Sequence, residues 1–458
     1  MARVLYWNIQ QFGINKINNP FFNRRQIGST INMQQASTQR AQLILDTMTS
    51  NIPDIFVVIE TSTGGGVEGS LITAGGQQGA LDLLAKIRAN AVLGANWMLV
   101  PPLILGQGGV SEGISVFYNS ANLSFTGPWG WQGAANPSDS VANIGIGNLV
   151  GYAAPWNNCL PAVAVPGGSN VNPGINSNQL AGQWLFTDNA MPPNRLQFPG
   201  IGNRPPYLTT FWDAANARTI KLLAYHAPPN FGPAANGTNQ LSNVREMTNN
   251  LAANEAGVIV GDFNVNIFNA YFEPIAYNNL INLLPAGAGY TRAINPTANN
   301  GWPDKGYVFT HMKHKYRNGA TPWETNEYPA YGYLGSNNHF AGYDSIDNVL
   351  TRYGAAAAGP AANITIVNRI TGSPYNAVMP TPGGAPPGHY AYTTGMAQIP
   401  VGMANAGSPV ALPLPPNGPN GDGGYTPGNI GALRRFLGWD NYGKIRSTSD
   451  HLPLIIDI

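Results

Sequence analysis

Short runs of apolar residues recur along the chain, separated by longer polar segments. The apolar runs are rich in β-branched and aromatic residues and are often bounded by Gly, Asn or Asp, which is typical of buried or half-buried strands. One example is "GVIVGDFN" (257–264), where Asp262 and Asn264 follow directly on Val258, Ile259 and Val260. The pattern predicts strands at residues 3–9, 54–60, 113–118, 207–213, 219–225, 257–260 and 452–458.

Apolar residues at helical spacing occur between several of these strands. Ala41, Ile44 and Met48, for example, fall on one face of a helix. The predicted helices span residues 34–49, 77–93 and 241–254. Strands alternating with helices indicate an α/β fold.

Three long segments, rich in Gly, Pro, Asn and Ala, interrupt this alternation at about 127–203, 285–340 and 352–440. Their composition resembles that of linkers. Segments this long inside a compact fold are usually ordered excursions or functional loops.

The composition describes a neutral surface rich in turns. Of the 458 residues, 10% are charged, against a usual value of about 25%, and there are 55 glycines and 38 prolines. The net charge of +1 provides no global field for a polyanion. Contact with nucleic acid would then depend on local basic clusters that bind backbone phosphates. The alternative is that these clusters are only solvated loops. The clusters lie at 311–319, 432–439 and 443–447.

A single cysteine, Cys159, excludes an internal disulfide and leaves the compartment open. The start of the chain, "MARVLYWNIQ", lacks the long apolar region of a secretory signal, and no stretch approaches ~20 consecutive apolar residues. We expect neither a signal peptide nor a transmembrane segment. A cytoplasmic location and export by a dedicated machine both remain open.

Polar residues gather at the ends of the predicted strands. Each alone has an ordinary explanation as a helix cap, a turn residue or a buried histidine with a partner. Together they offer oxygen ligands for Mg²⁺, an acid and a base, and amide donors, which are the groups that phosphoester cleavage needs. The set is Asn8, Glu60, Glu112, His226, Asp262, Asn264, Asp347, Asp450 and His451.

The order of these motifs resembles the endonuclease/exonuclease/phosphatase superfamily, typified by deoxyribonuclease I. The matching stretches are "WNIQ", "VVIE", "EGISVFY", "RPPYLTTF", "YHAP", "GDFN", "SIDNVL" and "SDHLP", and they span nearly the whole chain. The resemblance implies a four-layer α/β/β/α sandwich in which strand ends form one cleft. It also implies that residues 1–458 form one domain containing the three insertions.

The resemblance assigns a metal site and a phosphate site. It implies that Glu60 is the principal Mg²⁺ ligand, with Asn8 beside it and Asp450 near the metal or its water; Mn²⁺ or Ca²⁺ are alternatives to Mg²⁺. Asp262 and Asn264 match the pair that orients the nucleophile or metal and the scissile phosphate.

The resemblance also implies two catalytic histidines. His226 would be oriented by Glu112, and His451 by an aspartate of the "SIDNVL" strand. We prefer Asp347 over Asp344 as that aspartate, because an apolar strand continues beyond it. Arg204 in "RPPYLTTF" matches an arginine that contacts phosphate.

The histidine at the "YHAP" position, with Glu112 available to it, resembles deoxyribonuclease I, related toxin nucleases and sphingomyelinases. Abasic-site endonucleases usually have tyrosine there, and "GYDSIDNV" lacks the arginine of the inositol phosphatases. We expect a Mg²⁺-dependent endonuclease that hydrolyses DNA by in-line attack of water, with the two histidines as an acid–base pair. A phosphatase, a lipid phosphodiesterase and a catalytically dead binding module are the alternatives.

Overall fold

The computed structural model describes most of the predicted strands and helices. The described residues are 1–18, 33–66, 71–106, 108–127, 155–156, 159, 183–184, 204–248, 250–267, 269, 271–283, 289–295, 310–312, 343–355, 357, 364–367, 375–377 and 448–458. Most of the three predicted insertions lies outside these residues. That residues 1–458 form one domain containing these insertions therefore stays a prediction. The basic clusters at 432–439 and 443–447, and residues 313–319 of the third, also lie outside.

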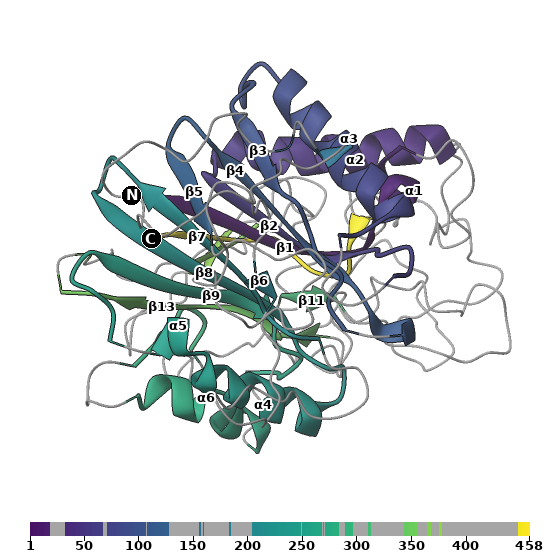
Figure 1. Ribbon diagram of the computed structural model, residues 1–458. Helices are drawn as coiled ribbons and strands as arrows, with labels where there is room; N and C mark the ends of the chain where they lie inside the picture. The colour runs from purple at the N-terminus through teal and green to yellow at the C-terminus, as the bar shows by residue number, and fades with distance from the viewer. Residues whose placement is uncertain are drawn as a thin grey trace, which may run out of the picture.

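The first sheet joins segments from far apart in the chain. Its order is β15 (Tyr375–Ala377), β14 (Ile364–Ile366), β16 (Leu454–Asp457), β1 (Arg3–Phe12), β2 (Ile55–Thr61), β4 (Gly113–Asn119) and β3 (Trp97–Val100). The β1–β2 pair is parallel and the other pairs are antiparallel. Helices α1 (Ile14–Ile17), α2 (Met33–Asn51) and α3 (Ala74–Ala89) lie on the outer side of this sheet (Figure 1).

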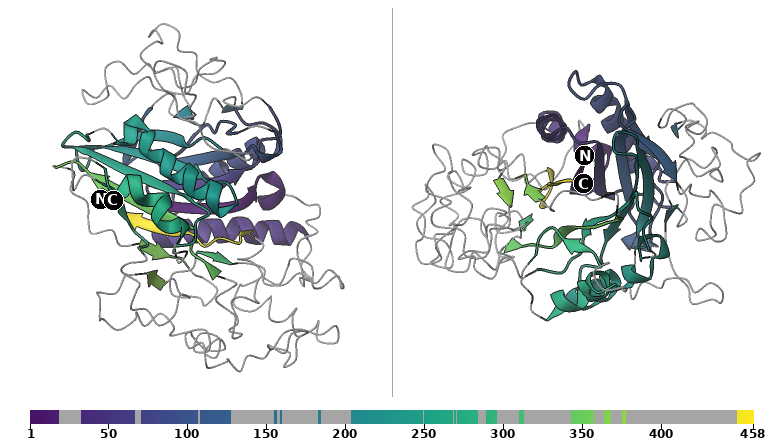
Figure 2. Two further views of the ribbon diagram at one scale, coloured as in Figure 1. Left: turned by 90° about the horizontal axis from the view of Figure 1, so that it is seen from below. Right: turned by 90° about the vertical axis from the view of Figure 1, so that its left-hand side faces the viewer.

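The second sheet has the order β10 (Thr291–Arg292), β13 (Asp347–Tyr353), β9 (Glu255–Asp262), β8 (Arg218–His226), β7 (Tyr207–Asp213) and β5 (Leu123–Gly127), and β6 (Gln183–Trp184) also pairs with β7. Helices α4 (Phe231–Gln240), α5 (Arg245–Thr248) and α6 (Phe272–Ile281) cover its outer face (Figures 1 and 2). A separate two-stranded ladder pairs β11 (His311–Met312) with β12 (Tyr343–Asp344).

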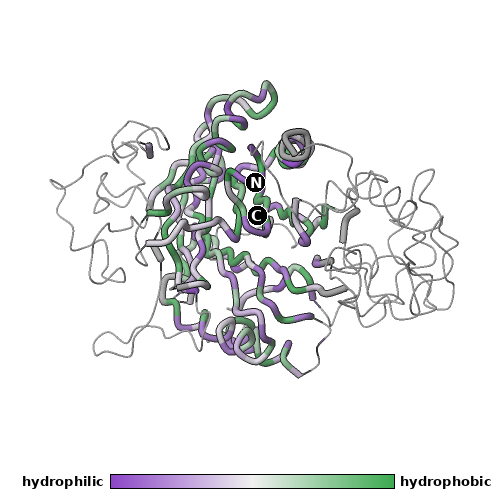
Figure 3. Tube along the Cα trace, turned by 90° about the vertical axis from the view of Figure 1, so that its right-hand side faces the viewer, coloured by the Kyte–Doolittle hydropathy of each residue, from purple (hydrophilic) through white to green (hydrophobic). Residues whose placement is uncertain are grey.

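The two sheets pack face to face with helices outside, so the expected α/β/β/α sandwich is confirmed. Apolar residues recur along the strands of both sheets (Figure 3). One core cluster includes Phe117 and Tyr118 of the first sheet together with Phe211 of the second, and the rings of Tyr118 and Phe211 lie 5.2 Å apart. A second cluster, with Leu223 and Ile259 in it, lies between the second sheet and its helices.

One predicted helix is wrong. The expected helix at 241–254 is only a 3₁₀ turn at Leu241–Asn243 and the short α5, and the longer helix is α4, just before it. The sequence of α4, "FGPAANGTNQ", has low helix propensity, and tertiary packing overrides this. Pro233 is in the first turn, where the missing N–H has no partner in any helix. Gly237 lets α4 approach Tyr225 closely, since a Cβ there would lie 2.2 Å from the tyrosine hydroxyl.

Cys159 is buried with 1% of its surface exposed, and burial raises the pKa of its thiol to about 12. An inert thiol is therefore consistent with its surroundings. Among the described residues, no helix combines the length and the apolar character that crossing a bilayer requires.

Candidate active site

Strand register brings three of the predicted residues to one edge of the second sheet. β8 and β9 are parallel with His226 opposite Asp262, and β9 and β13 are antiparallel with Asp347 opposite Asp262. The buried runs "LLAYH", "VIVGD" and "DNVL" thus place their polar end residues side by side. The side chains of His226, Asp262 and Asp347 are all buried.

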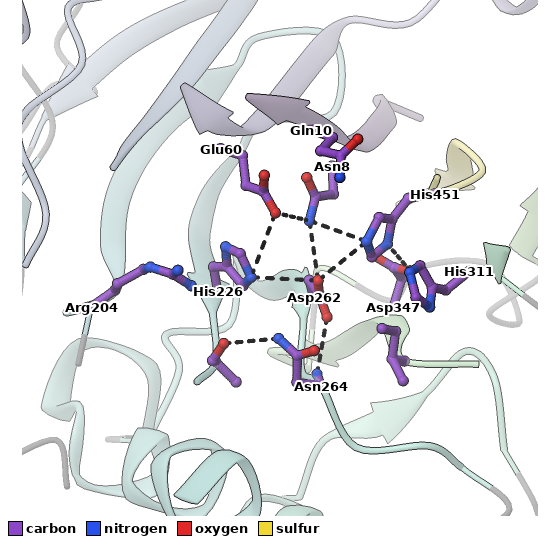
Figure 4. Close-up of polar contacts among 12 residues, drawn as sticks. Asn8, Gln10, Glu60, Arg204, His226, Asp262, Asn264, His311, Asp347 and His451 are labelled. Atoms are coloured by element: carbon purple, nitrogen blue, oxygen red, sulfur yellow. Dashed lines mark hydrogen bonds and ion pairs between the residues drawn. The ribbon is translucent and has the colours of Figure 1, made fainter. Parts of the chain in front are cut away.

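The first sheet supplies Asn8 and Glu60 from the adjacent parallel strands β1 and β2, where Asn8 lies opposite Ile59. The Asn8 amide nitrogen lies 3.2 Å from Glu60 Oε1 and 3.1 Å from Asp262 Oδ2. Asn8 therefore joins the two sheets at the site (Figure 4).

His226 lies between two carboxylates and faces a third. Its Nδ1 is 2.7 Å from Glu112 Oε1, and its Nε2 is 3.5 Å from Asp262 Oδ2 and 4.0 Å from Glu60 Oε1. Burial, followed by the charge of Arg204, lowers the pKa of His226 to about 4. Burial also raises the pKa of Glu112 to about 7. The imidazole is therefore uncharged at neutral pH.

His451 has the same arrangement and the opposite protonation. Its Nδ1 is 2.8 Å from Asp347 Oδ2, and its Nε2 is 3.6 Å from Asp262 Oδ2. Burial favours the neutral ring, but the nearby carboxylates of Asp347 and Asp262 outweigh it and raise the pKa of His451 to about 10. Two imidazoles that face one carboxylate with pKa values displaced in opposite directions are suited to acid and base roles.

Asp347 is held rigidly behind His451. Its Oδ1 accepts a hydrogen bond from the Tyr6 hydroxyl at 2.8 Å, and its Oδ2 accepts one from the Thr310 hydroxyl at 2.7 Å. Asp344 lies in β12, where its backbone pairs with His311. Asp347 is thus the aspartate that the structure places against the His451 ring.

Asp262 and Asn264 form a turn that orients both side chains. The Asn264 backbone N–H donates to Asp262 Oδ1 at 3.0 Å, and its amide donates to the Ala227 carbonyl at 2.9 Å. Burial raises the pKa of Asp262. Asn264 has a φ of 49° and Glu60 has a φ of 64°. This left-handed backbone conformation is unusual for residues other than glycine and tends to occur at functional sites.

Asn8 and Glu60 fit a divalent cation. Within the part of the chain that the structure describes, Asn8 Oδ1 is buried without a hydrogen-bond partner, and the Glu60 side chain beside it is 24% exposed. Asn8 Oδ1, which has no hydrogen-bond donor among the described residues, and the partly accessible Glu60 carboxylate are both oxygen ligands, which Mg²⁺ prefers. Asp450, the third predicted metal ligand, contacts Gln10 and His451. Its Oδ2 lies 3.3 Å from Gln10 Nε2 and its Oδ1 lies 3.9 Å from His451 Nε2.

Arg204 lies beside Glu112, the carboxylate that contacts His226. Its Nε donates to the Val110 carbonyl at 3.0 Å and lies 3.3 Å from Glu112 Oε2. Its Nη1 is buried with no hydrogen-bond partner among the described residues. Because that atom is buried, a phosphate would reach it only if the side chain moved, and the phosphate contact stays a prediction.

Sequence reasoning missed four residues of the site: Tyr6, Gln10, Thr310 and His311. Tyr6 and Gln10 alternate with Asn8 along β1, so the period of two in a strand could have revealed them. Thr310 and His311 fall within the predicted insertion at 285–340, where no strand pattern marked them.

The fold and the site together define a class of protein. Two packed mixed sheets with the strand-end residues at one place are what the resemblance to the endonuclease/exonuclease/phosphatase superfamily implies, so the fold expected from that resemblance is confirmed. No protein-family model matches the sequence, and no curated protein matches it significantly.

Several solved structures match the chain. D. rerio TDP2 complexed with a single strand DNA product is 9% identical with a TM-score of 0.38, and the match covers 100% of this chain and 98% of that one. The human Nocturnin catalytic domain with bound sulfate is 10% identical with a TM-score of 0.36, covering 100% and 93%. An endonuclease/exonuclease/phosphatase from Bacteroides vulgatus is 12% identical with a TM-score of 0.34, covering 77% and 87%. Likeness this distant carries no argument about activity, which depends on the residues described above.

Proposed function

We propose that the protein is a Mg²⁺-dependent phosphodiesterase that cleaves DNA as an endonuclease, by in-line attack of water. The observation that supports this best is the symmetry around Asp262. Two imidazoles, each with a carboxylate bonded to Nδ1, direct Nε2 toward the same Asp262 Oδ2 at 3.5 and 3.6 Å. The Asn8–Glu60 oxygen pair lies next to them.

Each residue has a definite task in such a reaction. Glu112 and Asp347 occupy the Nδ1 atoms, which fixes both rings with Nε2 directed to the substrate. One ring can accept a proton from the attacking water while the other donates one to the leaving oxygen. When bound by Glu60 and Asn8, Mg²⁺ would supply positive charge to a phosphate oxygen.

The choice of DNA follows from the branch of the superfamily that the site resembles. His226 is backed by Glu112, as in the deoxyribonuclease I-like motif pattern. The residue after Asp347 is Asn348, whose side chain bonds both the N–H and the carbonyl of Ile294, at 2.9 and 2.8 Å. Asn348 is uncharged and fully buried, so this position offers no cation to an inositol phosphate.

A substrate panel tests the proposal. The purified protein is incubated with supercoiled plasmid, RNA, an inositol phosphate and sphingomyelin, each with Mg²⁺ and with EDTA. Conversion of supercoiled to nicked and then linear plasmid, only with the metal, is the expected result. Turnover of another substrate instead would replace DNA by that substrate, and no turnover of any would favour a binding module.

Histidine variants test the acid–base pair. His226→Gln and His451→Gln should each slow turnover by roughly 10²–10⁴ while substrate affinity changes little. The double variant should lose much less than the product of the two, because residues that act as a unit are not additive. Near wild-type turnover in both single variants would exclude this mechanism.

A further inference from the structure

His311 lies directly beside His451. The two ring centroids are 4.5 Å apart with an interplanar angle of 37°. The backbones of these residues form an antiparallel bridge, continued by a hydrogen bond of 2.7 Å from Leu452 N–H to the Thr310 carbonyl. Residues opposite each other in such a bridge direct their side chains to the same face.

Asp450 completes a compact group with the two histidines. His311 Nε2 is 3.7 Å from Asp450 Oδ2, and His451 Nε2 is 3.9 Å from Asp450 Oδ1. One ligand atom from each residue lies within 4.8 Å of the others. A tetrahedral zinc site with bonds of about 2.0–2.1 Å places its ligand atoms about 3.3–3.4 Å apart. Small side-chain rotations would therefore bring these three atoms around one ion.

The surroundings of the group also suit a metal. A zinc-bound histidine usually donates its other ring N–H to a carboxylate, as His451 does to Asp347 at 2.8 Å. Gln10 contacts Asp450 Oδ2 at 3.3 Å. The side chains of His311 and Asp450 are 17% and 14% exposed, so an ion can reach them from solvent.

The chemistry of the donors separates this group from the Asn8–Glu60 pair. Two imidazole nitrogens and one carboxylate favour Zn²⁺ and its neighbours among transition metals, whereas Mg²⁺ prefers ligands that are all oxygen. Asp262, Asp347 and His451 form another group of three, but all three are buried. In that group His451 Nδ1 already contacts Asp347 Oδ2 at 2.8 Å.

We infer that His311, Asp450 and His451 form a second metal site, selective for Zn²⁺ over Mg²⁺, whose occupation inhibits the enzyme. A nitrogen lone pair that binds a metal cannot carry a proton, so Zn²⁺ on His451 Nε2 removes this ring from proton transfer. Zn²⁺ binding stands on geometry alone; its inhibitory effect rests on the proposed phosphodiesterase function.

Binding is measured separately from activity. Metal-free protein is titrated with Co²⁺, a coloured substitute for Zn²⁺, in the presence of excess Mg²⁺, and Zn²⁺ is then added. One equivalent of Co²⁺ should give the visible absorption of a nitrogen-ligated ion, and Zn²⁺ should abolish it. His311→Phe keeps a ring stacked on His451 but has no ligand atom, so it should weaken binding at least ~10-fold. His311→Gln serves the same purpose if the Phe variant does not fold.

His226→Gln is the matched control, because it removes an imidazole of the same site that is not part of the group; Co²⁺ binding should persist in this variant. Absence of binding to the wild type, or equal binding to His311→Phe, would overturn the metal site. In plasmid cleavage with Mg²⁺, the Zn²⁺ concentration for half inhibition should rise at least ~10-fold in His311→Phe. Binding without inhibition of measurable cleavage would refute the inhibitory effect. Binding that depends on His311 in a protein that cleaves none of the substrates would leave the metal site standing and refute the proposed function instead.

Discussion

The hydroxyl of Tyr6 offers a sharp test of how Asp347 supports His451. Tyr6→Phe removes one hydrogen bond to the fully buried carboxylate of Asp347 and leaves the rest of the side chain unchanged. Hydrogen bonds to charged groups are worth about 1.5–3 kcal/mol, so the free energy of unfolding should fall by about 2–3 kcal/mol. If about 1 kcal/mol of this holds Asp347 in the orientation that His451 uses, turnover should fall about 5-fold.

Tyr290→Phe is the matched control. The Tyr290 hydroxyl is also buried and donates to the Met247 carbonyl at 2.8 Å. That carbonyl keeps a second donor, Arg352 Nη1 at 3.0 Å, so the loss of stability should be only about 1 kcal/mol. Turnover should not change, because Tyr290 does not touch the site.

Denaturant unfolding gives the two stabilities, and kcat on the substrate that the panel identifies gives the two rates. A kcat of Tyr6→Phe equal to that of Tyr290→Phe, with only the stability lowered, would refute the reasoning. Tyr6 would then be a packing residue, and Thr310 would suffice to hold Asp347.

Three further changes have defined outcomes. Glu60→Gln should weaken the response to Mg²⁺ with little change in melting temperature, since Gln has nearly the same shape but no charge; a large drop in melting temperature would indicate a structural role. Asp347→Asn should reduce turnover as strongly as loss of His451, and Asp344→Asn should be mild; the reverse order would move the assignment of the aspartate by three residues. Cys159 should react with a thiol reagent only after unfolding, because burial raises its pKa to about 12; rapid labelling of the native protein would contradict this.

The predicted strands were reliable because their apolar runs are buried on a sheet, and seven of them correspond to β1, β2, β4, β7, β8, β9 and β16. Their end residues could therefore be collected from the sequence. Strand register then brought them together: the pairings of Asp262 with His226 and with Asp347 depend on hydrogen bonding between strands, which no local pattern encodes.

Other features depend on tertiary contacts and left weaker signals. Helix α4 forms in a stretch with Gly, Pro and Asn because it packs on Tyr225, and local propensity argues against it. Thr310 directly precedes the two-residue strand β11, to which His311 belongs, and so short a strand has no periodic pattern. Their positions are fixed by the bridge to His451, a residue 140 positions further along the chain.

The position of β16 between β1 and β14 has a consequence for folding kinetics. His451 lies just before this strand, so pairing of β16 with β1 brings it to the site. One of the contacts that hold it, from Trp7 Nε1 to the His451 carbonyl, joins residues 444 positions apart. Pairing of such distant segments pays its loop-closure entropy before it gains contacts, so it is slow. Refolding from denaturant should therefore restore the circular dichroism of helices and of local strand pairs first. Catalytic competence should return in a later phase, limited by the arrival of β16.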